Sequence, residues 1–269
     1  MYEGLYAPLP DGQAYARRIG LPWPLTPDLD TLDRIILAHQ CTVPFENLQC
    51  YDEGQMPSLE IAALFEKVVV QHRGGFCFEL NALLLSFLKA LGYDAWGVSC
   101  CIIRGRDFIP PMLHRAILVR LGETVYYCDV GYGGPQPPGP VPLGGERTIC
   151  GERFIFLKQD ETWWRLDRYT SKGEREKVIL LWPMPQAETY FIPYNFYCSR
   201  NPDSLFAKKR VLNLRTAEGS LALMDTTLTE RRGGETTVTE ARSREELAAM
   251  LKEKFGIEYP AASLRWENA

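Results

Sequence analysis

The 269-residue sequence predicts an α+β fold organised in three successive zones. Apolar residues at helical spacing dominate the first third. β-branched and aromatic runs punctuated by glycine follow, and a hairpin pattern with one more helix ends the chain. We place the zones at residues 1–92, 93–199 and 200–269. A composition of 46% hydrophobic and 24% charged residues is typical of a soluble globular protein.

The first zone is predicted to be helical. Residues 31–41 place apolar side chains at helical spacing, with Asp30 as the candidate N-cap. This helix must end before Pro44, because the residue that precedes a proline avoids the α conformation. A second helix is expected over residues 59–72, where a pair of glycines follows.

The second zone predicts an antiparallel sheet. The runs "DAWGVSCCIIRG", "LHRAILVRLG" and "ETVYYCDVGYGG" are typical of strands and hairpins, with a tight turn at Gly122. The Gly- and Pro-rich residues 131–145 can form neither a helix nor a central strand. Further strands in "RFIFLKQ" and "TWWRLDRYT" favour a β-barrel or a curled antiparallel sheet.

The third zone predicts a hairpin followed by a helix. The hairpin turns at residues 233–234. In the helix, Ser243 is the N-cap, Glu246 completes a capping box and Gly256 is the terminator. The basic cluster "AKKR" at residues 207–210 is interpreted as a solvated strand end, with a phosphate contact as the alternative.

Charge and hydropathy limit the partners. The formal net charge of -4 and a pI near 5.6 offer no basic surface for nucleic acid, so we expect a small-molecule or protein partner. No apolar run approaches the roughly 20 residues that span a bilayer, so no membrane partner is predicted. The first residues show no basic stretch followed by an apolar one, and we therefore expect a cytoplasmic protein without a signal peptide.

The eight cysteines do not have the spacing of a zinc site. None forms a C-x-x-C pair, so no metal ligands are predicted. In a reducing cytosol, most of them are expected to be small buried hydrophobes. They are Cys41, Cys50, Cys77, Cys100, Cys101, Cys128, Cys150 and Cys198.

Of the three histidines, His114 has the sequence context that best suits a functional site. His39 lies on an apolar helical face and is expected to be a core or capping residue. His72 is predicted at a helix C-terminus, where a cation interacts favourably with the helix dipole. His114 opens a β-like run after two prolines, so it is expected at a strand edge where a side chain can face a cleft.

Cys77 differs from the other cysteines because a helix is predicted to begin at it or at the next residue. This third helix runs through Leu91 and ends at Gly92. The free N–H groups and positive dipole end of a helix start favour thiolate over thiol, and a nearby imidazolium lowers the thiol pKa further. Gly74 and Gly75 are expected to leave the sulfur open to a substrate.

Asp129 supplies a third group for a nucleophilic site. It interrupts a run suited to a buried strand, where a carboxylate is costly unless it is paired. It follows His114 by 15 positions, which suits one strand, a turn and the return strand, so the two side chains can meet across the pair. The order Cys77, His114, Asp129 therefore predicts an activated cysteine nucleophile, with its acyl donor still undefined.

Several motifs give the sequence a resemblance to the arylamine N-acetyltransferases over most of its length. They are "VPFENL" (43–48), "RGGFCFELN" (73–81), a histidine leading a strand, "DVGYGG" (129–134) and "NFYCSRNPDSLFAKKRVL" (195–212). The resemblance implies a helical bundle, an antiparallel β-barrel and a C-terminal α/β lid around a cysteine-protease-like Cys-His-Asp core.

The resemblance also implies a ping-pong reaction. The thiolate of Cys77 would take the acetyl group of acetyl-CoA, a cosubstrate rather than a tightly bound cofactor. It would pass this group to an arylamine, arylhydrazine or N-hydroxyarylamine. His114 would be the base and Asp129 the residue that orients it.

The resemblance also implies roles for other residues. Tyr132 falls where the family has an aromatic residue lining the acceptor pocket, and Phe45 and Phe76 would be further apolar walls, with core packing as the alternative. Arg104 and Gly105 are assigned to CoA contacts, with a solvated loop as the alternative. Buried hydrogen bonds around the site are expected from Glu46, Asn47, Arg73, Glu79 and Asn81.

Other functions remain open at this stage. An amide synthase, or a transferase of longer acyl groups such as propionyl or malonyl, would use the same chemistry on another substrate. A non-catalytic binding protein would not need all three of Cys77, His114 and Asp129. A cysteine protease or transglutaminase-like hydrolase would not account for "VPFENL" and "DVGYGG".

Overall fold

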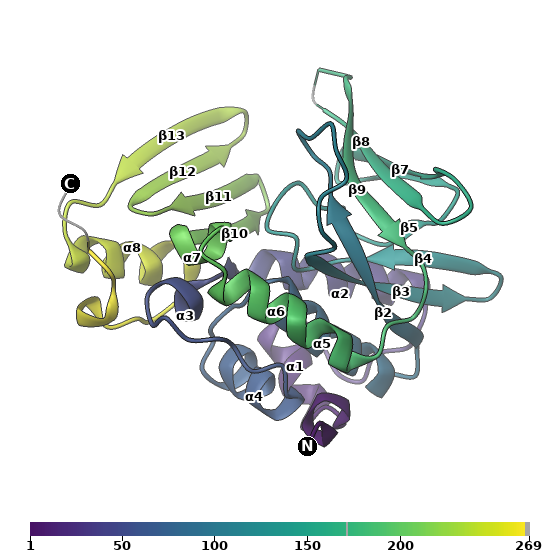
Figure 1. The fold of residues 1–269 in the computed structure, drawn as a ribbon, viewed down its shortest axis with the longest axis horizontal. Coiled ribbons are helices and arrows are strands. Elements are labelled where there is room, and N and C mark those ends of the chain that lie inside the picture. Colours follow the sequence, from purple (N-terminus) through teal and green to yellow (C-terminus); the bar gives the residue numbers. More distant parts are fainter. Residues whose placement is uncertain (171, 267–269) are drawn as a thin grey trace.

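The computed structural model describes residues 1–170 and 172–266. Its helices are α1 (Gly12–Arg18), α2 (Leu29–Thr42), α3 (Leu48–Tyr51), α4 (Ile61–Phe65), α5 (Cys77–Ala90), α6 (Phe191–Arg200), α7 (Leu205–Lys208) and α8 (Arg244–Phe255). Short 3-10 turns lie at Glu3–Tyr6, Glu188–Tyr190 and Ala261–Ser263, and a π-helical turn lies at Glu66–Val70. Two sheets stand side by side above α1, α4 and α5 (Figure 1). Among the described residues, no helix has the length and apolar character that a membrane crossing requires.

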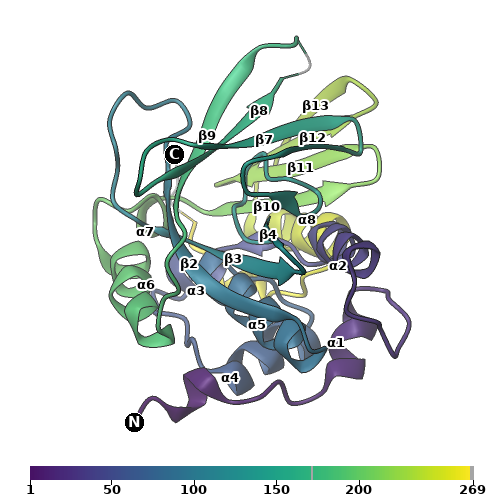
Figure 2. The ribbon, with the colours of Figure 1, turned by 90° about the vertical axis from the view of Figure 1, so that its right-hand side faces the viewer.

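The larger sheet is a nearly closed antiparallel barrel, which confirms the expected fold class. Its strands are β2 (Asp94–Ile102), β3 (His114–Leu121), β4 (Thr124–Cys128), β5 (Val141–Pro142), β6 (Glu146–Ile149), β7 (Glu152–Lys158), β8 (Trp164–Tyr169) and β9 (Arg175–Trp182). Their order is β5-β4-β3-β2-β9-β8-β7-β6, and the end strands β5 and β6 contact each other. Figure 2 shows the barrel strands above α5.

The smaller sheet combines two distant parts of the chain. Its strands, in spatial order, are β1 (Phe45–Glu46), β10 (Val211–Thr216), β11 (Gly219–Met224), β12 (Thr227–Arg232) and β13 (Glu235–Glu240). Strand β1 comes from the helical zone and pairs antiparallel with β10. Helix α8 packs its apolar side chains against this sheet. The C-terminal zone is therefore tied through β1 to the segment that precedes Cys77.

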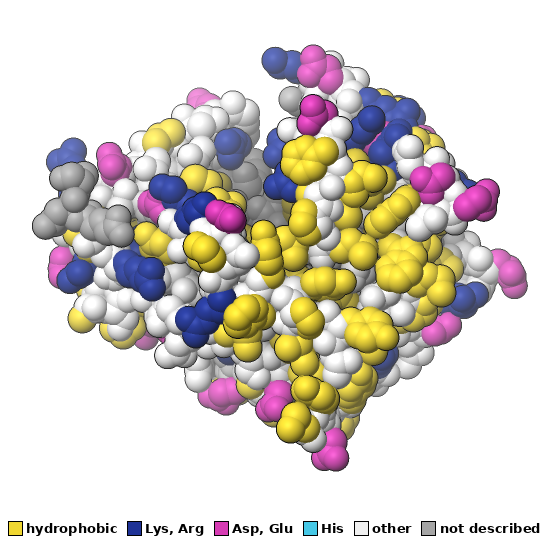
Figure 3. Space-filling model, viewed as in Figure 1, with side chains coloured by type: hydrophobic (Ala, Val, Ile, Leu, Met, Phe, Trp, Pro, Cys, Tyr) yellow, Lys and Arg dark blue, Asp and Glu magenta, His cyan; other side chains and the backbone are white. Residues whose placement is uncertain are grey.

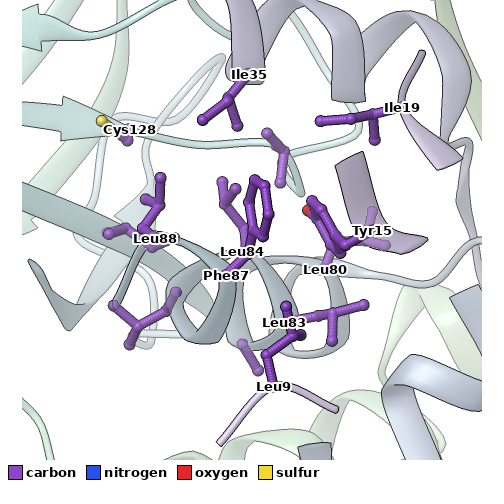
Figure 4. Packing of buried hydrophobic residues seen from close by; sticks show 14 of the residues in the cluster. Leu9, Tyr15, Ile19, Ile35, Leu80, Leu83, Leu84, Phe87, Leu88 and Cys128 are labelled. Atoms are coloured by element: carbon purple, nitrogen blue, oxygen red, sulfur yellow. The ribbon is translucent and has the colours of Figure 1, made fainter. Parts of the chain in front are cut away.

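Helix α5 is the centre of the helical zone. It is apolar on nearly all sides, which is typical of a helix buried throughout its length. Figure 4 shows Leu80, Leu84 and Phe87 packed towards α1 and α2, and the Phe87 ring stacks on Tyr15 with centroids 4.2 Å apart. On another side α5 packs against β2 and β3. This packing fixes the helix start, where Cys77 lies.

Local turn signals were predicted correctly. Gly92, Gly122 and Gly256 all have left-handed φ values, of 94°, 60° and 68°. Both residues of the 233–234 turn also have positive φ values, and the turn joins β12 to β13. Ser243 caps α8, since its hydroxyl accepts the Glu246 N–H at 3.1 Å. The glycines act through their own backbone and Ser243 through a hydroxyl at its own helix end, so these local effects are visible in the sequence.

Two predicted caps were wrong in detail. The N-cap of α2 is Asp28, whose carboxylate accepts the Thr31 N–H at 2.8 Å, whereas Asp30 lies inside the first turn. An acidic residue is favourable at both places, and sequence alone does not separate them. The Glu246 carboxylate accepts from the backbone of Arg242 at 2.8 Å, one residue before the position that a capping box uses.

Two further expectations were wrong. The predicted helix over residues 59–72 begins at Ile61 and ends as the π-helical turn, so His72 lies beyond it with a φ of 56°. The "AKKR" cluster is not a solvated strand end, because it begins in α7 and Arg210 is buried. The Nε of Arg210 donates to the Asp52 carboxylate at 3.0 Å, and a buried guanidinium needs such a partner.

Candidate active site

His114 and Asp129 meet inside the barrel. His114 is the first residue of β3, and Asp129 directly follows β4. The ring Nε2 lies 2.7 Å from Asp129 Oδ2, and both side chains are buried. The strand register sets Ile117 opposite Cys128, so Asp129 is not the direct cross-strand neighbour of His114. The two side chains instead meet beyond the end of the β3–β4 ladder.

The Asp129 carboxylate accepts four hydrogen bonds. Asn81 Nδ2 and the Gly131 backbone N–H each donate to Oδ1 at 2.8 Å. The Tyr127 hydroxyl donates to Oδ2 at 2.7 Å, and His114 Nε2 bonds to the same oxygen. Burial alone would raise the pKa of Asp129, but His114 and then Asn81 and Tyr127 outweigh it and lower this pKa. The carboxylate is therefore held in its charged form.

Cys77 is the first residue of α5, and its thiol is hydrogen-bonded to His114; the sulfur also lies 3.9 Å from the Leu113 carbonyl oxygen. Because His114 Nε2 faces Asp129, Nδ1 is the ring atom left for the sulfur. Burial raises the pKa of the Cys77 thiol, and the hydrogen bond and charge of His114 only partly oppose the rise. This direction is opposite to the expectation from the helix start, because the sequence does not reveal that the sulfur is only 3% exposed.

The positive charge of His114 offsets part of the effect of burial on the Cys77 thiol. Burial by itself would lower the pKa of the ring, but Asp129 and then Cys77 raise it to about 10. The ring is therefore held as imidazolium at neutral pH, which is the partner that a buried thiolate needs. Of the other histidines, His39 is buried and bonded through Nδ1 to the Tyr15 hydroxyl at 2.7 Å, as expected for a core residue.

The glycines near Cys77 have a different role from the predicted one. A Cβ on Gly74 would lie 1.9 Å from the Pro44 carbonyl oxygen, and one on Gly75 would strike the Glu79 side chain. These glycines therefore allow the turn to approach protein atoms rather than a substrate. Sequence reasoning missed Gly131, where a Cβ would lie 2.7 Å from the Cα of Cys77. The strand end can approach the nucleophile only because residue 131 has no side chain.

A buried charge network supports the turn before Cys77, as predicted for the "PFEN" and "RGGFCFELN" residues. The Glu46 carboxylate accepts from the Arg73 Nε at 3.0 Å, and Glu79 accepts from the Phe76 N–H at 3.1 Å. Lys67, which the sequence did not single out, donates to Glu79 at 2.6 Å. The Glu79 carboxylate caps α5 from within its first turn, and Lys67 and Arg73 hold that turn and the segment before it from outside the helix.

A cleft of about 1150 Å³ lies between the two sheets and reaches towards the site. Val130, Gly133 and Phe45 line it on the side of the Cys-His-Asp group. Its lining also includes four arginines, Arg104, Arg168, Arg215 and Arg231, and two glutamates, Glu152 and Glu218. The hollow between the sheets is visible near the top of Figure 3, with Lys and Arg side chains on both of its sides. The cleft therefore offers an apolar wall and a basic wall to a ligand.

The predicted substrate residues lie in different environments. Phe45 lines the cleft, and the Tyr132 ring lies 5.7 Å from the His114 ring between centroids. Phe76 is fully buried between Phe78 and Phe206, which is the core-packing alternative.

The two predicted CoA contacts, Arg104 and Gly105, also lie in different environments. Arg104 lines the cleft and donates to the Glu176 carboxylate at 2.8 Å. Gly105 has a φ of 68° in the loop after β2 and is not among the described residues that line the cleft. The positive φ gives Gly105 a role in the turn of that loop.

Comparisons with known proteins agree with this fold and site. The family model described as N-acetyltransferase matches residues 28–264. The chicken (Gallus gallus) arylamine N-acetyltransferase, pineal gland isozyme NAT-3, is 31% identical over 86% of this chain and 88% of its own. The arylamine N-acetyltransferase structure from Nocardia farcinica is 28% identical, with a TM-score of 0.84 over 97% of this chain and 93% of its own.

A further structure, the arylamine N-acetyltransferase (BACCR)NAT3 from Bacillus cereus, is 25% identical, with a TM-score of 0.84 over 93% of this chain and 100% of its own. That protein is described as having a unique Cys-His-Glu catalytic triad. The family match covers most of the sequence, and the structural matches cover nearly the whole fold. The chain is therefore an acyltransferase that belongs to the arylamine N-acetyltransferase family.

Proposed function

We propose that this enzyme moves an acetyl group from acetyl-CoA to arylamines, arylhydrazines or N-hydroxyarylamines by a ping-pong mechanism at Cys77, His114 and Asp129. The main support is the continuous series of contacts from the Cys77 thiol through the His114 ring to the Asp129 carboxylate, beside a large cleft. A buried nucleophile, a base and a group that orients the base form the minimum set for acyl transfer by cysteine.

In the first half-reaction, the Cys77 thiolate attacks the carbonyl carbon of the thioester. A new carbon–sulfur bond forms on the enzyme, the bond from the acetyl carbon to CoA sulfur breaks, and the departing sulfur takes the proton of the His114 imidazolium. In the second, the amine nitrogen attacks the acetyl carbon and gives a proton to His114, and the Cys77 thiolate leaves. The enzyme returns to the thiolate–imidazolium pair from which the attack began.

The basic wall of the cleft is proposed to receive the phosphates of CoA. Arg104 and Arg168 both donate to Glu176, at 2.8 and 2.6 Å, so two guanidinium groups share one carboxylate. The excess positive charge suits phosphate groups, which arginine binds in a bidentate manner. Tyr132 and Phe45 are proposed as the apolar contacts of the aromatic acceptor.

A donor panel tests this function. Acetyl-, propionyl- and malonyl-CoA would be supplied with an aromatic amine or hydrazide, and the free CoA thiol measured. We expect acetyl-CoA to be used and Cys77→Ser to release no CoA above background, because a serine hydroxyl is not ionised beside this imidazole. A dephospho-CoA thioester should have a higher KM, since it loses a phosphate contact. Turnover by Cys77→Ser near the wild-type rate would refute the assignment.

A further inference from the structure

Tyr127 contacts the same carboxylate oxygen as His114. Its hydroxyl donates to Asp129 Oδ2 at 2.7 Å, and the His114 Nε2 bonds to that oxygen at 2.7 Å. The Tyr127 side chain is fully buried in the barrel, where its ring packs on Phe156 with centroids 5.1 Å apart. The phenol is therefore held rigidly against the carboxylate.

The Tyr127 hydroxyl is a permanent donor. Burial and then the charge of Asp129 raise the pKa of this phenol well above its usual value, so the hydroxyl stays protonated over the working range of the enzyme. A neutral hydroxyl has one O–H group, and here that group points at the carboxylate. Its contribution to the site does not change with pH.

The Tyr127 hydroxyl and the His114 imidazolium both donate to Asp129 Oδ2, so two donors share the negative charge of this oxygen. Asp129 Oδ1 already accepts from Asn81 and Gly131, so neither oxygen is left to the ring alone. A hydrogen bond to a carboxylate stabilises its charged form and reduces the basicity that it offers to other donors. Without Tyr127, the carboxylate would hold the proton of His114 more tightly.

The other titratable groups around the pair come from several elements. Cys77 lies on α5, Cys100 on β2 and Cys128 on β4, and Tyr132 follows Asp129. Burial raises the pKa of each of these thiols and of the Tyr132 phenol. Asp129 is therefore the charged partner whose strength decides how firmly the imidazolium is held.

We propose that Tyr127 is a positioning residue that shares Asp129 Oδ2 with His114 and thereby keeps the ring able to accept and release a proton. This inference rests on the acyl transfer proposed above, in which His114 both gives a proton to CoA and takes one from the amine. A ring held too tightly as imidazolium would be a weaker acid towards the departing CoA sulfur. It would also stay protonated at neutral pH and so could not take the proton of the amine in the second half-reaction.

The test is Tyr127→Phe, with Tyr126→Phe as the matched control. The first change removes the hydroxyl and keeps the ring that packs on Phe156. The second makes the same change on the neighbouring strand residue, which packs on the opposite side, towards the helical core. Transfer from pre-formed acetyl-enzyme to a weakly basic aromatic amine would be measured across pH.

We expect the Tyr127→Phe rate to rise at higher pH than the wild-type rate and to be roughly three- to tenfold lower at pH 7. The KM for the amine should change little, and Tyr126→Phe should match the wild type. The thermal midpoint of Tyr127→Phe should fall, because a buried hydrogen bond to a carboxylate is lost. A purely structural tyrosine would leave the pH profile in place. Superimposable profiles for Tyr127→Phe and wild type would overturn the inference.

A second measurement separates this inference from the proposed function. The His114 ring would be titrated by NMR in a Cys77→Ala background, where no coupled thiol complicates the curve. Adding Tyr127→Phe should move the midpoint to higher pH, and an unchanged midpoint would overturn the inference. If the wild type forms no acetyl-enzyme, the proposed function fails, and the ring titration still decides the role of Tyr127.

Discussion

At the scale of single residues, the reactivity of Cys77 depends on its contact with His114. Burial raises the pKa of this thiol, and the charge and hydrogen bond of His114 lower it. The helix start supplies N–H groups but does not bring the sulfur into water. The imidazole therefore decides the pH at which the thiolate forms.

Measuring the rate of Cys77 alkylation against pH tests whether His114 controls the ionisation of this thiol. In His114→Asn, the charge and hydrogen bond that lower the pKa of the Cys77 thiol are lost, while the burial that raises this pKa remains. We therefore expect the midpoint for reaction with iodoacetamide to move to higher pH. The rate at pH 7 should fall about tenfold or more, since each pKa unit changes the thiolate fraction about tenfold. Mass spectrometry would follow the peptide with Cys77, and the exposed Cys150 is an internal control that should not change. An unshifted Cys77 profile would contradict this view.

At the scale of elements, the site depends on how closely the end of β4 approaches the start of α5. Asn81 joins the two, since its Nδ2 donates to Asp129 and its Oδ1 accepts the Val130 N–H at 3.1 Å. Gly131 follows directly and has no space for a side chain against Cys77. The spacing of nucleophile and base is thus set by two packed backbones.

A methyl group at residue 131 should disturb this spacing. In Gly131→Ala, the added Cβ meets the backbone of Cys77, which is fixed by α5, so one segment must move. We expect a loss of about 1–3 kcal/mol in the free energy of unfolding and a larger proportional loss of acetyl transfer. Urea unfolding and CoA release would measure the two. Gly4→Ala is the control, because its Cβ meets only the side chain of Glu60. Wild-type activity in Gly131→Ala would show that this approach is unimportant.

At the scale of the whole molecule, the C-terminal sheet is fastened to the helical zone rather than resting on it. Strand β1 pairs with β10, and Arg210 donates to the carboxylate of Asp52, with both side chains buried. Arg210 also donates to the backbone carbonyls of Asp225 and Arg265. One guanidinium therefore joins three distant segments of the chain.

Removing that guanidinium should destabilise the whole fold. In Arg210→Ala the Asp52 carboxylate stays buried without its ion-pair partner, which costs about 3–5 kcal/mol. Urea unfolding should show this loss in a single transition if the zones unfold together. Lys252→Ala is the comparison, because the Lys252–Glu258 pair is largely exposed and contributes little to stability. A small effect in Arg210→Ala would mean that the sheet is held mainly by β1.

The sequence predicted the features that depend on local rules or on a family motif. Gly122 and Gly256 were found because their turns need left-handed backbone. Tyr127 and Arg210 were missed, since a tyrosine in a strand and an arginine in a basic cluster show no sign of a buried carboxylate partner. The raised pKa of Cys77 was missed for the same reason, because burial is a property of the assembled fold.

The pairing of β1 with β10 has a consequence for the newly made chain. Phe45 and Glu46 leave the ribosome early, and their partners Asn213 and Leu212 leave it late. Phe45 borders the cleft, and Glu46 holds Arg73 in the turn before the cysteine. The reactive turn therefore gains its full set of neighbours only after most of the protein has been synthesised. A partly made chain would carry the cysteine without the finished surroundings that make it a controlled nucleophile.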